Sequence, residues 1–390
     1  MHTAPARASS ASSLRRLSGW VGGGLLALTT AAASPAAAEV VSELVEPGVI
    51  AYRGERFFPI GAYHVRTVGD VDALAEGGFN AAEVIYEGDH DAFGAVLDRA
   101  LERGVAVVAA CRSEDVLAEL LVERYADHEA IFMWTVEDDH DDEAYRSFEE
   151  VKAKSERIGE ADPTRLRYAS ATAYFPERRA RAADWSSFIE VPAVQSYPIT
   201  PLPAWSPVTE GAGPMQDNYE KIKMYVDAAP GKPVLANIQA FPWHSGGRMP
   251  TVREIRAMTY GGLVAGVKGV LFYELRPILS DPAYWEPVQA LAAELGEVAP
   301  FVLHHEMTAL DTQSDDAAAS AWVGSDGEGL LVVTHTGEGG TGVSVGLPEG
   351  FRRAVPMFPG VDDSLISNGS ALAGFLAPGA AQVYRISKSD

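Results

Sequence analysis

The sequence is nearly free of cysteine, and Cys111 is the single example in 390 residues. One cysteine cannot form a disulfide within its own chain, so cysteine pairing lends no support to an exported fate. The fold must therefore be stabilised by its core. An apolar content of 47% and a charged content of 22% are typical of a globular protein that can build one.

Basic residues are scarce, because Lys and Arg number 31 against 54 Asp and Glu, a formal net charge of −23. Nucleic acids and anionic membranes are themselves negative and would repel such a chain. We therefore expect neither of them as a partner. The charge says little about a neutral ligand such as a sugar.

The chain also lacks an apolar run suited to a membrane span. Its first 38 residues instead have the order of an export signal, with Arg15 and Arg16 before a short apolar stretch and "SPAAA" before Glu39. A disordered, Ala-rich tail is the alternative interpretation. The signal interpretation predicts cleavage after Ala38 and a secreted or periplasmic protein. Cleavage would remove three arginines and no acid, which leaves 28 basic and 54 acidic residues and a net charge of −26.

Between about residues 49 and 300, short apolar runs alternate with amphipathic stretches of helical period. Most of these runs are continuous, which is typical of parallel strands covered on both faces. Eight strand–helix repeats predict an α/β fold, a closed (β/α)8 TIM barrel over residues 39–300. An open doubly wound sheet is the competing fold, but no G-x-G-x-x-G follows the first predicted strand. The predicted strands are residues 57–65, 80–87, 105–111, 130–137, 166–174, 193–199, 233–241 and 269–275.

The pattern changes after residue 300. "ASAWVGSDGEGLLVVTHTGEGGTGVSVGLPEG" contains short strand-like runs separated by "SDGEG" and "GEGGTG", which are typical turn sequences. "AAQVYRIS" near the end of the chain is a further strand candidate. These features predict a small antiparallel β-sandwich over residues 301–390.

In a (β/α)8 barrel the chemistry lies on the loops that follow the strands. The ends of the predicted strands are rich in acids, amides and aromatic rings. Rings stack on sugar faces, while amides and carboxylates form hydrogen bonds with hydroxyls, so this mixture suits a carbohydrate ligand. The candidate positions are His64, Glu87, Glu137, Asp138, Asp139, Tyr197, Gln239, Trp243, His244 and Glu274.

Several segments resemble, in order, those of barrel glycoside hydrolases. "GERFFPIGAYHV" resembles their opening strand, "GFNAAEVIYEGD" their second strand, and "FMWTVEDDHD" the W-x-x-x-D-E-P-D segment of strand four. "ADPTRLRY", "VQSYPI" and "KPVLANIQAF" resemble the segments around strands five, six and seven. The resemblance spans about residues 50–276. The family that it indicates is the clan of retaining (β/α)8 glycosidases, with its cellulase-like and β-galactosidase-like relatives.

The resemblance implies a general acid at the end of strand four and a nucleophilic Glu at the end of strand seven. The first position falls on Asp139, with Asp138 just before it. The second falls on Gln239, which cannot act as a carboxylate nucleophile. Glu274, at the end of strand eight, is the nearest acid that could replace it.

Glycoside hydrolysis usually needs two carboxyl groups beside the scissile bond. We therefore predict Asp138 or Asp139 as the acid and Glu274 as the base or second carboxylate. Strands four and eight lie opposite each other in such a barrel, and the gap between them favours a water-mediated, inverting route. The residues predicted to bind the sugar are His64, Glu87, Glu137, Tyr197, Gln239 and Trp243.

Some of these acids have ordinary alternative roles. Asp141, Asp142 and Glu143 are expected to lie in water at the start of the next helix, whose dipole favours acids. Glu274 could instead form an ion pair with Arg276. Clustered oxygens could hold calcium or magnesium, but their spacing matches no calcium loop, and we predict no metal and no cofactor. The rival function is a non-catalytic carbohydrate-binding barrel, which the missing strand-seven acid favours.

Overall fold

The structure is a computed structural model that describes residues 40–111, 115–200, 208, 212–243, 246–362 and 364–388. The expected export signal and His244 lie outside these residues. In the described part of the chain, no helix is both long enough and apolar enough to cross a membrane.

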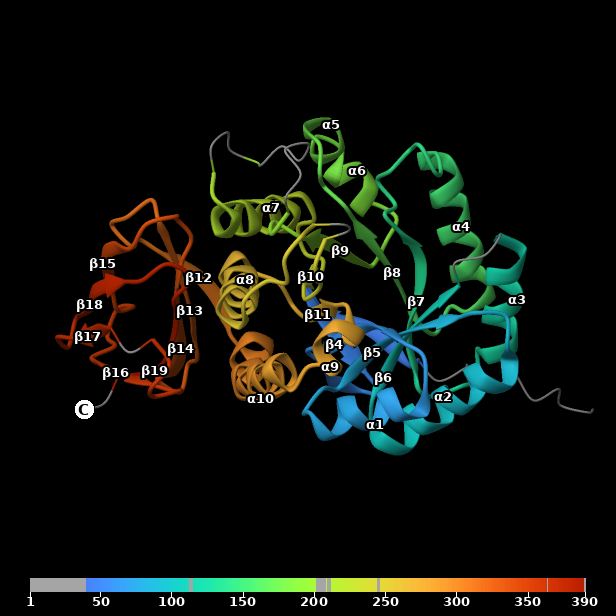
Figure 1. Ribbon diagram of the computed structural model, residues 1–390, viewed down its shortest axis with the longest axis horizontal. Coiled ribbons are helices and arrows are strands. Elements are labelled where there is room, and N and C mark those ends of the chain that lie inside the picture. Colours follow the sequence, from blue (N-terminus) through green and yellow to red (C-terminus); the bar gives the residue numbers. More distant parts are fainter. Residues whose placement is uncertain are drawn as a thin grey trace, which may run out of the picture. The chain divides into compact units, whose positions relative to one another are not determined.

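Eight parallel strands close into a barrel in the order β10-β11-β4-β5-β6-β7-β8-β9 (Figure 1). Each predicted strand segment overlaps one of them, although β7 ends one residue later and β9 begins two residues earlier than predicted, so the predicted (β/α)8 barrel is confirmed. In this order β7 and β11 are four strands apart, so they face each other across the barrel. The strands are β4 (Ile60–Val65), β5 (Ala81–Tyr86), β6 (Ala106–Cys111), β7 (Ile131–Asp138), β8 (Leu166–Ala171), β9 (Val191–Ser196), β10 (Leu235–Gln239) and β11 (Val270–Tyr273).

Local sequence explains where several helices of the barrel begin. Helices α1, α4 and α8 are capped by Thr67, Ser147 and Thr251, respectively. The hydroxyl of each capping residue accepts a hydrogen bond from the backbone N–H of the acid three residues later, and the side chain of that acid accepts one from the backbone N–H of the capping residue. Such reciprocal capping satisfies backbone donors that the first helical turn leaves unpaired. The helices are α1 (Val68–Glu76), α2 (His90–Arg103), α3 (Asp115–Tyr125), α4 (Phe148–Ala161), α5 (Pro176–Arg179), α6 (Ala182–Ser186), α7 (Pro214–Ala228), α8 (Val252–Ala265), α9 (Leu275–Leu279) and α10 (Pro282–His304).

A small antiparallel sheet precedes the barrel, formed by β1 (Ser42–Glu46), β2 (Val49–Tyr52) and β3 (Glu55–Arg56). The hydroxyl of Ser42 donates to the carbonyl of Phe132 at 2.6 Å and accepts from the backbone N–H of Leu166 at 2.9 Å. Both partners lie at the starts of barrel strands, so this sheet covers the end of the barrel away from the candidate residues.

A buried polar cluster lies inside the barrel. The amide of Asn237 donates to the hydroxyls of Tyr63 at 2.8 Å and Tyr168 at 2.9 Å, and those two hydroxyls also bond to each other. Burial raises the pKa of both tyrosines well above the usual value, so both stay neutral and serve as hydrogen-bond donors. The cluster joins three strands beneath the barrel mouth.

The chain after the barrel forms two antiparallel sheets, which confirms the predicted β-sandwich. Leu331, Val345 and Leu372 are fully buried in the core between the sheets. The first sheet contains β12 (Glu306–Leu310), β13 (Ala317–Val323), β14 (Glu328–His335), β19 (Ala381–Ser387) and β16 (Arg353–Pro356). The second contains β15 (Thr341–Gly346), β18 (Ala371–Leu376) and β17 (Leu365–Ser367).

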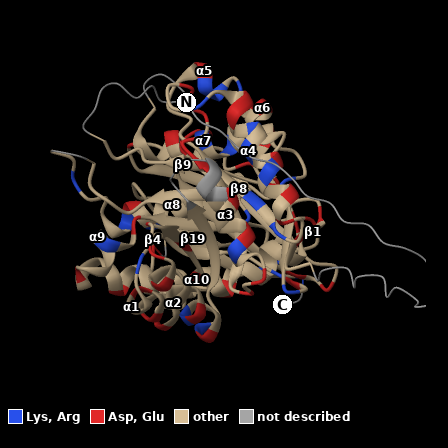
Figure 2. Ribbon diagram, turned by 90° about the vertical axis from the view of Figure 1, so that its right-hand side faces the viewer, with Lys and Arg blue, Asp and Glu red and all other residues tan. Residues whose placement is uncertain are grey.

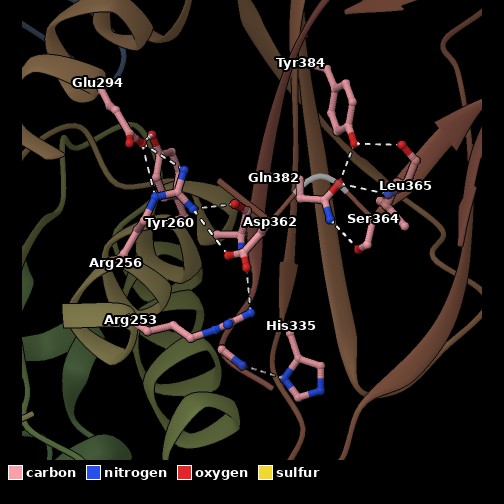
Figure 3. A network of polar contacts seen from close by, with 12 residues as sticks. Arg253, Arg256, Tyr260, Glu294, His335, Asp362, Ser364, Leu365, Gln382 and Tyr384 are labelled. Atoms are coloured by element: carbon pink, nitrogen blue, oxygen red, sulfur yellow. Dashed lines mark hydrogen bonds and ion pairs between the residues drawn. The ribbon is translucent and has the colours of Figure 1, made fainter. Parts of the chain in front are cut away.

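Polar contacts fix the sandwich to helix α8 (Figure 3). Arg256 contacts Glu294 of α10 at 2.8 Å and donates to the carbonyl of Ala381 in β19. One turn earlier on the helix, Arg253 contacts Asp362 of the sandwich at 2.6 Å. Arg256 is largely buried, and a buried charge is costly unless it is paired in this way. The sandwich is thus packed on the barrel and is not merely tethered to it.

The acidic excess is visible on the outside of the barrel. Figure 2 shows Asp and Glu on the surrounding helices, α1, α2 and α6 among them. Some of these acids face arginines, as where Arg99 and Arg103 both contact Asp72, at 2.7 and 3.3 Å. Pairs as exposed as these typically contribute at most about 1 kcal/mol each. The stability of the fold therefore depends mainly on its buried core.

Candidate active site

Asp138 and Asp139 lie together at the mouth of the barrel, at the end of β7. Asp138 Oδ1 accepts hydrogen bonds from the hydroxyl of Ser170 and from Gln195 Nε2, the latter at 3.1 Å. The same amide nitrogen of Gln195 also donates to Asp139 Oδ1. Gln195 is buried on β9. The two aspartates that the sequence proposed as the acid are therefore held by one amide.

Aromatic side chains surround these aspartates. The ring of Tyr197 lies 5.4 Å from that of Tyr273 and 6.4 Å from that of Trp243, centroid to centroid. The hydroxyl of Tyr174 donates to Gln195 Oε1 at 3.4 Å. Burial raises the pKa of Tyr174 well above its usual value, and the charges of Asp139 and Asp138 raise it further. Tyr174 therefore stays neutral, and with Tyr197 and Tyr273 it forms one wall of the mouth.

Glu274 lies beside His64, and not beside the arginine that the sequence offered as an alternative partner. Glu274 Oε2 is 2.5 Å from His64 Nδ1, whereas Arg276 contacts Asp70 at 3.2 Å. The imidazole is 7% exposed and the carboxylate 30%, so the carboxylate is the member of the pair that a ligand can reach. The ring of His64 also meets Tyr273 edge to face at 4.9 Å.

The two carboxylate groups share one mouth. The ring of Tyr273 contacts both His64 and Tyr197. Tyr197 in turn lies close to Asp138. Burial raises the pKa of Tyr197, and the nearby Tyr174 and the charge of Asp138 raise it further. The predicted cluster of Asp138, Glu274 and aromatic rings is therefore brought together, with aromatic side chains between acids from opposite strands.

Two predicted binding residues point elsewhere. Glu137 Oε2 contacts Lys154 of α4 at 3.0 Å and Arg146 at 2.9 Å, so its side chain faces the outer helix layer. Glu87 is largely exposed, and its carboxylate is 3.5 Å from Arg66. Neither is held at the mouth by the contacts that hold the two aspartates. We therefore assign Glu137 a structural role and leave Glu87 out of the candidate site.

Gln239 is fully buried and holds the backbone of a neighbouring loop. Its Oε1 accepts from the N–H of Ile199 at 2.8 Å, and its Nε2 donates to the carbonyls of Ile199 at 2.8 Å and Phe241 at 3.2 Å. These bonds fix the loop after β9, which carries Tyr197. The amide at the strand-seven position therefore has a structural role instead of the predicted contact with a sugar.

We expect Gln239→Glu to destabilise the protein without creating a nucleophile. The new carboxylate could not donate to the two carbonyls, and an unmet buried hydrogen bond costs about 1–3 kcal/mol. Urea unfolding at pH 7 measures this cost, with Gln289→Glu on the outer helix α10 as a matched change of charge. Equal stability of Gln239→Glu and the native protein would contradict the role assigned to the amide.

Asp141 and Asp142 do not lie in water at the start of a helix, as the sequence predicted. Helix α4 begins at Phe148, several residues further on. Asp141 is buried and accepts from the N–H groups of Thr172 and Ala173 at 2.7 and 2.8 Å. Asp142 contacts Arg178 at 2.8 Å. These acids tie the loops after β7 and β8 together, and Glu143 alone is mostly exposed, in an ion pair with Arg181.

His140, within the same cluster, is a buried imidazole. Neither of its ring nitrogens has a hydrogen-bond partner among the described residues, and its ring lies 5.4 Å from that of Trp185. Burial lowers its pKa below the usual value of about 6.5, although the charge of Asp141 opposes this. The folded protein therefore holds this histidine neutral at pH values where the unfolded chain protonates it.

We expect this histidine to weaken the fold in mild acid. Above pH 6.5 it is neutral in both states and has no effect. Below that value the unfolded chain binds the proton first, so the free energy of unfolding falls by up to about 1.4 kcal/mol per pH unit until the folded pKa is reached. Urea unfolding at pH 7.5 and 5.5 should show a smaller loss for His140→Leu than for the native protein. Equal losses would refute the prediction.

Sequence reasoning missed two residues near the site. Glu83 is 2% exposed on β5, inside the run "AAEVIY". Tyr174 follows β8 and reaches Gln195. The signal for Glu83 was present, since a charged residue in the middle of an apolar strand is rarely buried without a specific role. Tyr174 gave no such signal, because its approach to the mouth depends on the path of a loop.

The described side chains do not form a metal centre. Among them, no group of three or more His, Cys, Asp or Glu residues could hold a metal ion. The acids at the mouth are instead bonded to hydroxyl, amide and imidazole groups. The arrangement supplies two carboxylates, proton donors and stacking surfaces.

Neither a family model nor a curated protein matches this sequence. Among solved structures, a glycoside hydrolase matches with a TM-score of 0.63 at 14% identity, over 89% of this chain and 97% of its own. A family 27 β-L-arabinopyranosidase from Geobacillus stearothermophilus, in complex with arabinose, gives 0.58 at 12% identity, over 85% and 97%. An α-amylase from Geobacillus thermoleovorans, complexed with acarbose, gives 0.54 at 10% identity, over 83% and 92%.

The fold and the comparisons together define a (β/α)8 barrel protein. More particularly, its barrel has the fold of the glycoside hydrolases. At these identities the likeness concerns the fold alone. The chemistry must be argued from the residues at the mouth.

Proposed function

We propose that this protein hydrolyses a glycosidic bond in an oligo- or polysaccharide, with Asp138 and Glu274 as the two carboxyl groups. The observation that carries the proposal is that acids from β7 and from the end of β11 line one aromatic mouth. Glycoside hydrolysis needs two carboxyl groups beside the bond, and rings of this kind suit a sugar face. The export signal that the sequence predicts before Glu39 would place this activity outside the cytoplasm.

The hydrogen bonds favour roles opposite to those first expected. Asp138 Oδ1 is the acceptor in its hydrogen bonds with Ser170 and Gln195, which hold the carboxylate at the mouth. It therefore suits the base that activates a water molecule. Glu274 shares a short contact with His64 Nδ1, across which a proton can be held and returned. It therefore suits the acid that protonates the leaving oxygen.

The positions of the two acids on opposite strands support an inverting reaction. In inverting enzymes the carboxyl groups are far enough apart to admit a water molecule, whereas in retaining enzymes they are about 5 Å apart. Water activated by Asp138 would attack the anomeric carbon while Glu274 protonates the departing oxygen. The hydroxyl of Tyr197 is buried and has no hydrogen-bond partner among the described residues, so a sugar hydroxyl could bond to it only after neighbouring side chains move.

The direct test is turnover of a panel of neutral polysaccharides and aryl glycosides by the mature chain. Proton NMR of the first product then reports its anomeric configuration. Inversion is the expected result. Retention with a trapped glycosyl-enzyme would reject Asp138 as a base that acts through water, and would identify the residue that carries the sugar.

A non-catalytic carbohydrate-binding barrel is the second candidate, and Gln239 favours it. The strand-seven position of the resembling glycosidases holds a Glu, whereas here an amide is committed to the loop backbone. This candidate predicts saturable sugar binding that weakens in Trp243→Ala, with no turnover of any substrate in the panel. Calorimetric titration with the same sugars separates the two functions.

A further inference from the structure

Glu83 occupies an unusual position in the barrel. It lies on β5, next to the first barrel strand, and is 2% exposed. Its Oε2 accepts a hydrogen bond from the backbone N–H of His64 at 2.9 Å. A carboxylate buried this deeply is uncommon unless it bonds to specific partners. The position of its bond, at the residue that contacts Glu274, suggests what it does.

The backbone of β4 is irregular opposite this carboxylate. Ala62 pairs with Ala82 and Val65 pairs with Val84, so two residues of β4 face the single position of Glu83. Such a bulge bends the strand, re-aims a side chain and leaves an N–H group outside the regular ladder. The carboxylate of Glu83 binds the N–H of His64 within that bulge. It therefore takes the place of a missing strand partner.

His64 also has a backbone conformation that a side chain disfavours. Its φ is +63°, in the left-handed region, which costs a non-glycine residue about 1–2 kcal/mol. Such a conformation persists only when the surroundings hold it. Its effect here is to direct the imidazole toward Glu274, with Nδ1 at 2.5 Å from Oε2. The bond to Glu83 and the edge contact with Tyr273 are among the contacts that hold it.

We propose that Glu83 is a positioning residue that fixes the bulge at His64 and thereby sets the orientation of Glu274. The chain of contacts runs from the Glu83 carboxylate to the His64 N–H, through the imidazole, and to the Glu274 carboxyl. Its catalytic consequence rests on the proposed function. The geometric claim does not, and it can be measured in a protein that hydrolyses nothing.

The test compares Glu83→Met with Glu83→Gln. Methionine has a similar length but accepts no comparable hydrogen bond, whereas the glutamine oxygen can still accept from His64. Long-range proton–nitrogen NMR, read through the carbon-bound protons of the imidazole, reports the Nδ1 resonance of His64, assigned by its loss in His64→Asn. We expect the Nδ1 resonance to shift in Glu83→Met, because the contact with Glu274 is displaced. In Glu83→Gln the Nδ1 resonance should stay in place, with only the backbone N–H of His64 moved upfield.

Activity gives a second, separable measurement. A carboxyl displaced by about 1 Å can cost on the order of 100-fold in rate. We expect Glu83→Met to lower kcat by about this factor with little change in KM, and Glu83→Gln to recover most of it. Asp162→Asn, a change to an equally buried carboxylate at the other end of the barrel, controls for general loss of stability. It should leave the ring resonance and kcat unchanged in the folded protein.

The outcomes are distinct. A folded Glu83→Met that keeps the native His64 ring resonance overturns the proposal, whether or not any substrate is hydrolysed. If Glu83→Met does not fold, Glu83→Gln decides, because an unmoved His64 backbone resonance would show that no bond to the carboxylate exists. A shifted ring resonance in a protein without turnover supports the positioning role and rejects only the proposed hydrolysis.

Discussion

Asp138→Asn is expected to lower kcat/KM for glycoside hydrolysis by about 10²- to 10⁴-fold, the range that a general acid or base contributes. The amide has almost the same shape as the carboxylate, and its oxygen can still accept from Ser170 and Gln195. The fold should therefore survive, and the loss should come from the missing charge. The measurement is the rate on the best substrate of the panel, with thermal unfolding to confirm equal stability.

Glu274→Gln is expected to cost a similar factor for a different reason. It removes the proton donor while keeping a group that can bond to His64. Substrates with a good leaving group need no protonation, so aryl glycosides with an activated phenol should lose much less than natural glycosides. The same substrates should not restore activity in Asp138→Asn, because a good leaving group does not replace the base. This difference between the two variants assigns the roles of acid and base.

Two neighbouring aspartates serve as matched comparisons. Asp139→Asn changes the residue that shares Gln195 with Asp138, and Asp142→Asn changes an acid paired with Arg178 away from the amide. We expect a small effect for Asp142→Asn. A larger loss in Asp139→Asn than in Asp138→Asn would move the base to Asp139. Full activity in both Asp138→Asn and Glu274→Gln would refute the proposed pair.

The architecture could be predicted from the sequence because burial on both faces leaves a direct trace in composition. Every residue of β4 and β9 is buried, and each of the two strands overlaps a predicted segment. The sandwich was equally predictable from its turns. The short sheet of β1 to β3 was not, since its strands are brief and partly exposed.

Side-chain direction at the barrel mouth was not predictable, and bulges are the reason. The register of β7 against β8 shifts between Thr135 and Glu137, so the alternation of faces breaks just before the acids. Counting along the strand therefore could not say that Glu137 would face α4 while Asp138 turned inward. The same difficulty applies to His64, which lies within the shift in β4. Periodicity carries no information on where such a shift occurs.

The segment "ADPTRLRY", which contributed to the resemblance with glycosidases, has a structural role. Asp162 accepts from the indole N–H of Trp134 at 2.7 Å and contacts Arg165 at 2.8 Å, with both side chains almost fully buried. Arg165 also donates to the carbonyls of Ile131 at 2.8 Å and His128 at 3.0 Å. The segment joins the starts of β7 and β8, at the opposite end of the barrel from the proposed site.

Arg165→Met should therefore have the largest effect on stability without touching the proposed chemistry. Removing one member of a buried ion pair leaves the other charge unpaired and costs about 3–5 kcal/mol. The matched control is Arg167→Met, two residues further on, whose pair with Glu190 is partly exposed and should cost about 1 kcal/mol or less. Urea unfolding measures both. Equal losses in the two variants would contradict the prediction.

The pH dependence of this difference follows from Asp162. Burial opposes its ionisation, but hydrogen bonds from Thr164 and Trp134 and the charge of Arg165 outweigh burial and lower its pKa. A carboxylate with a lowered folded pKa contributes stability above its unfolded pKa of about 3.9 and loses that contribution as the pH falls through the folded value. The advantage of the native protein over Arg165→Met should therefore be full at pH 7 and should shrink below about pH 4. An advantage that stays constant from pH 7 to pH 3 would show that Arg165 acts through its carbonyl bonds alone.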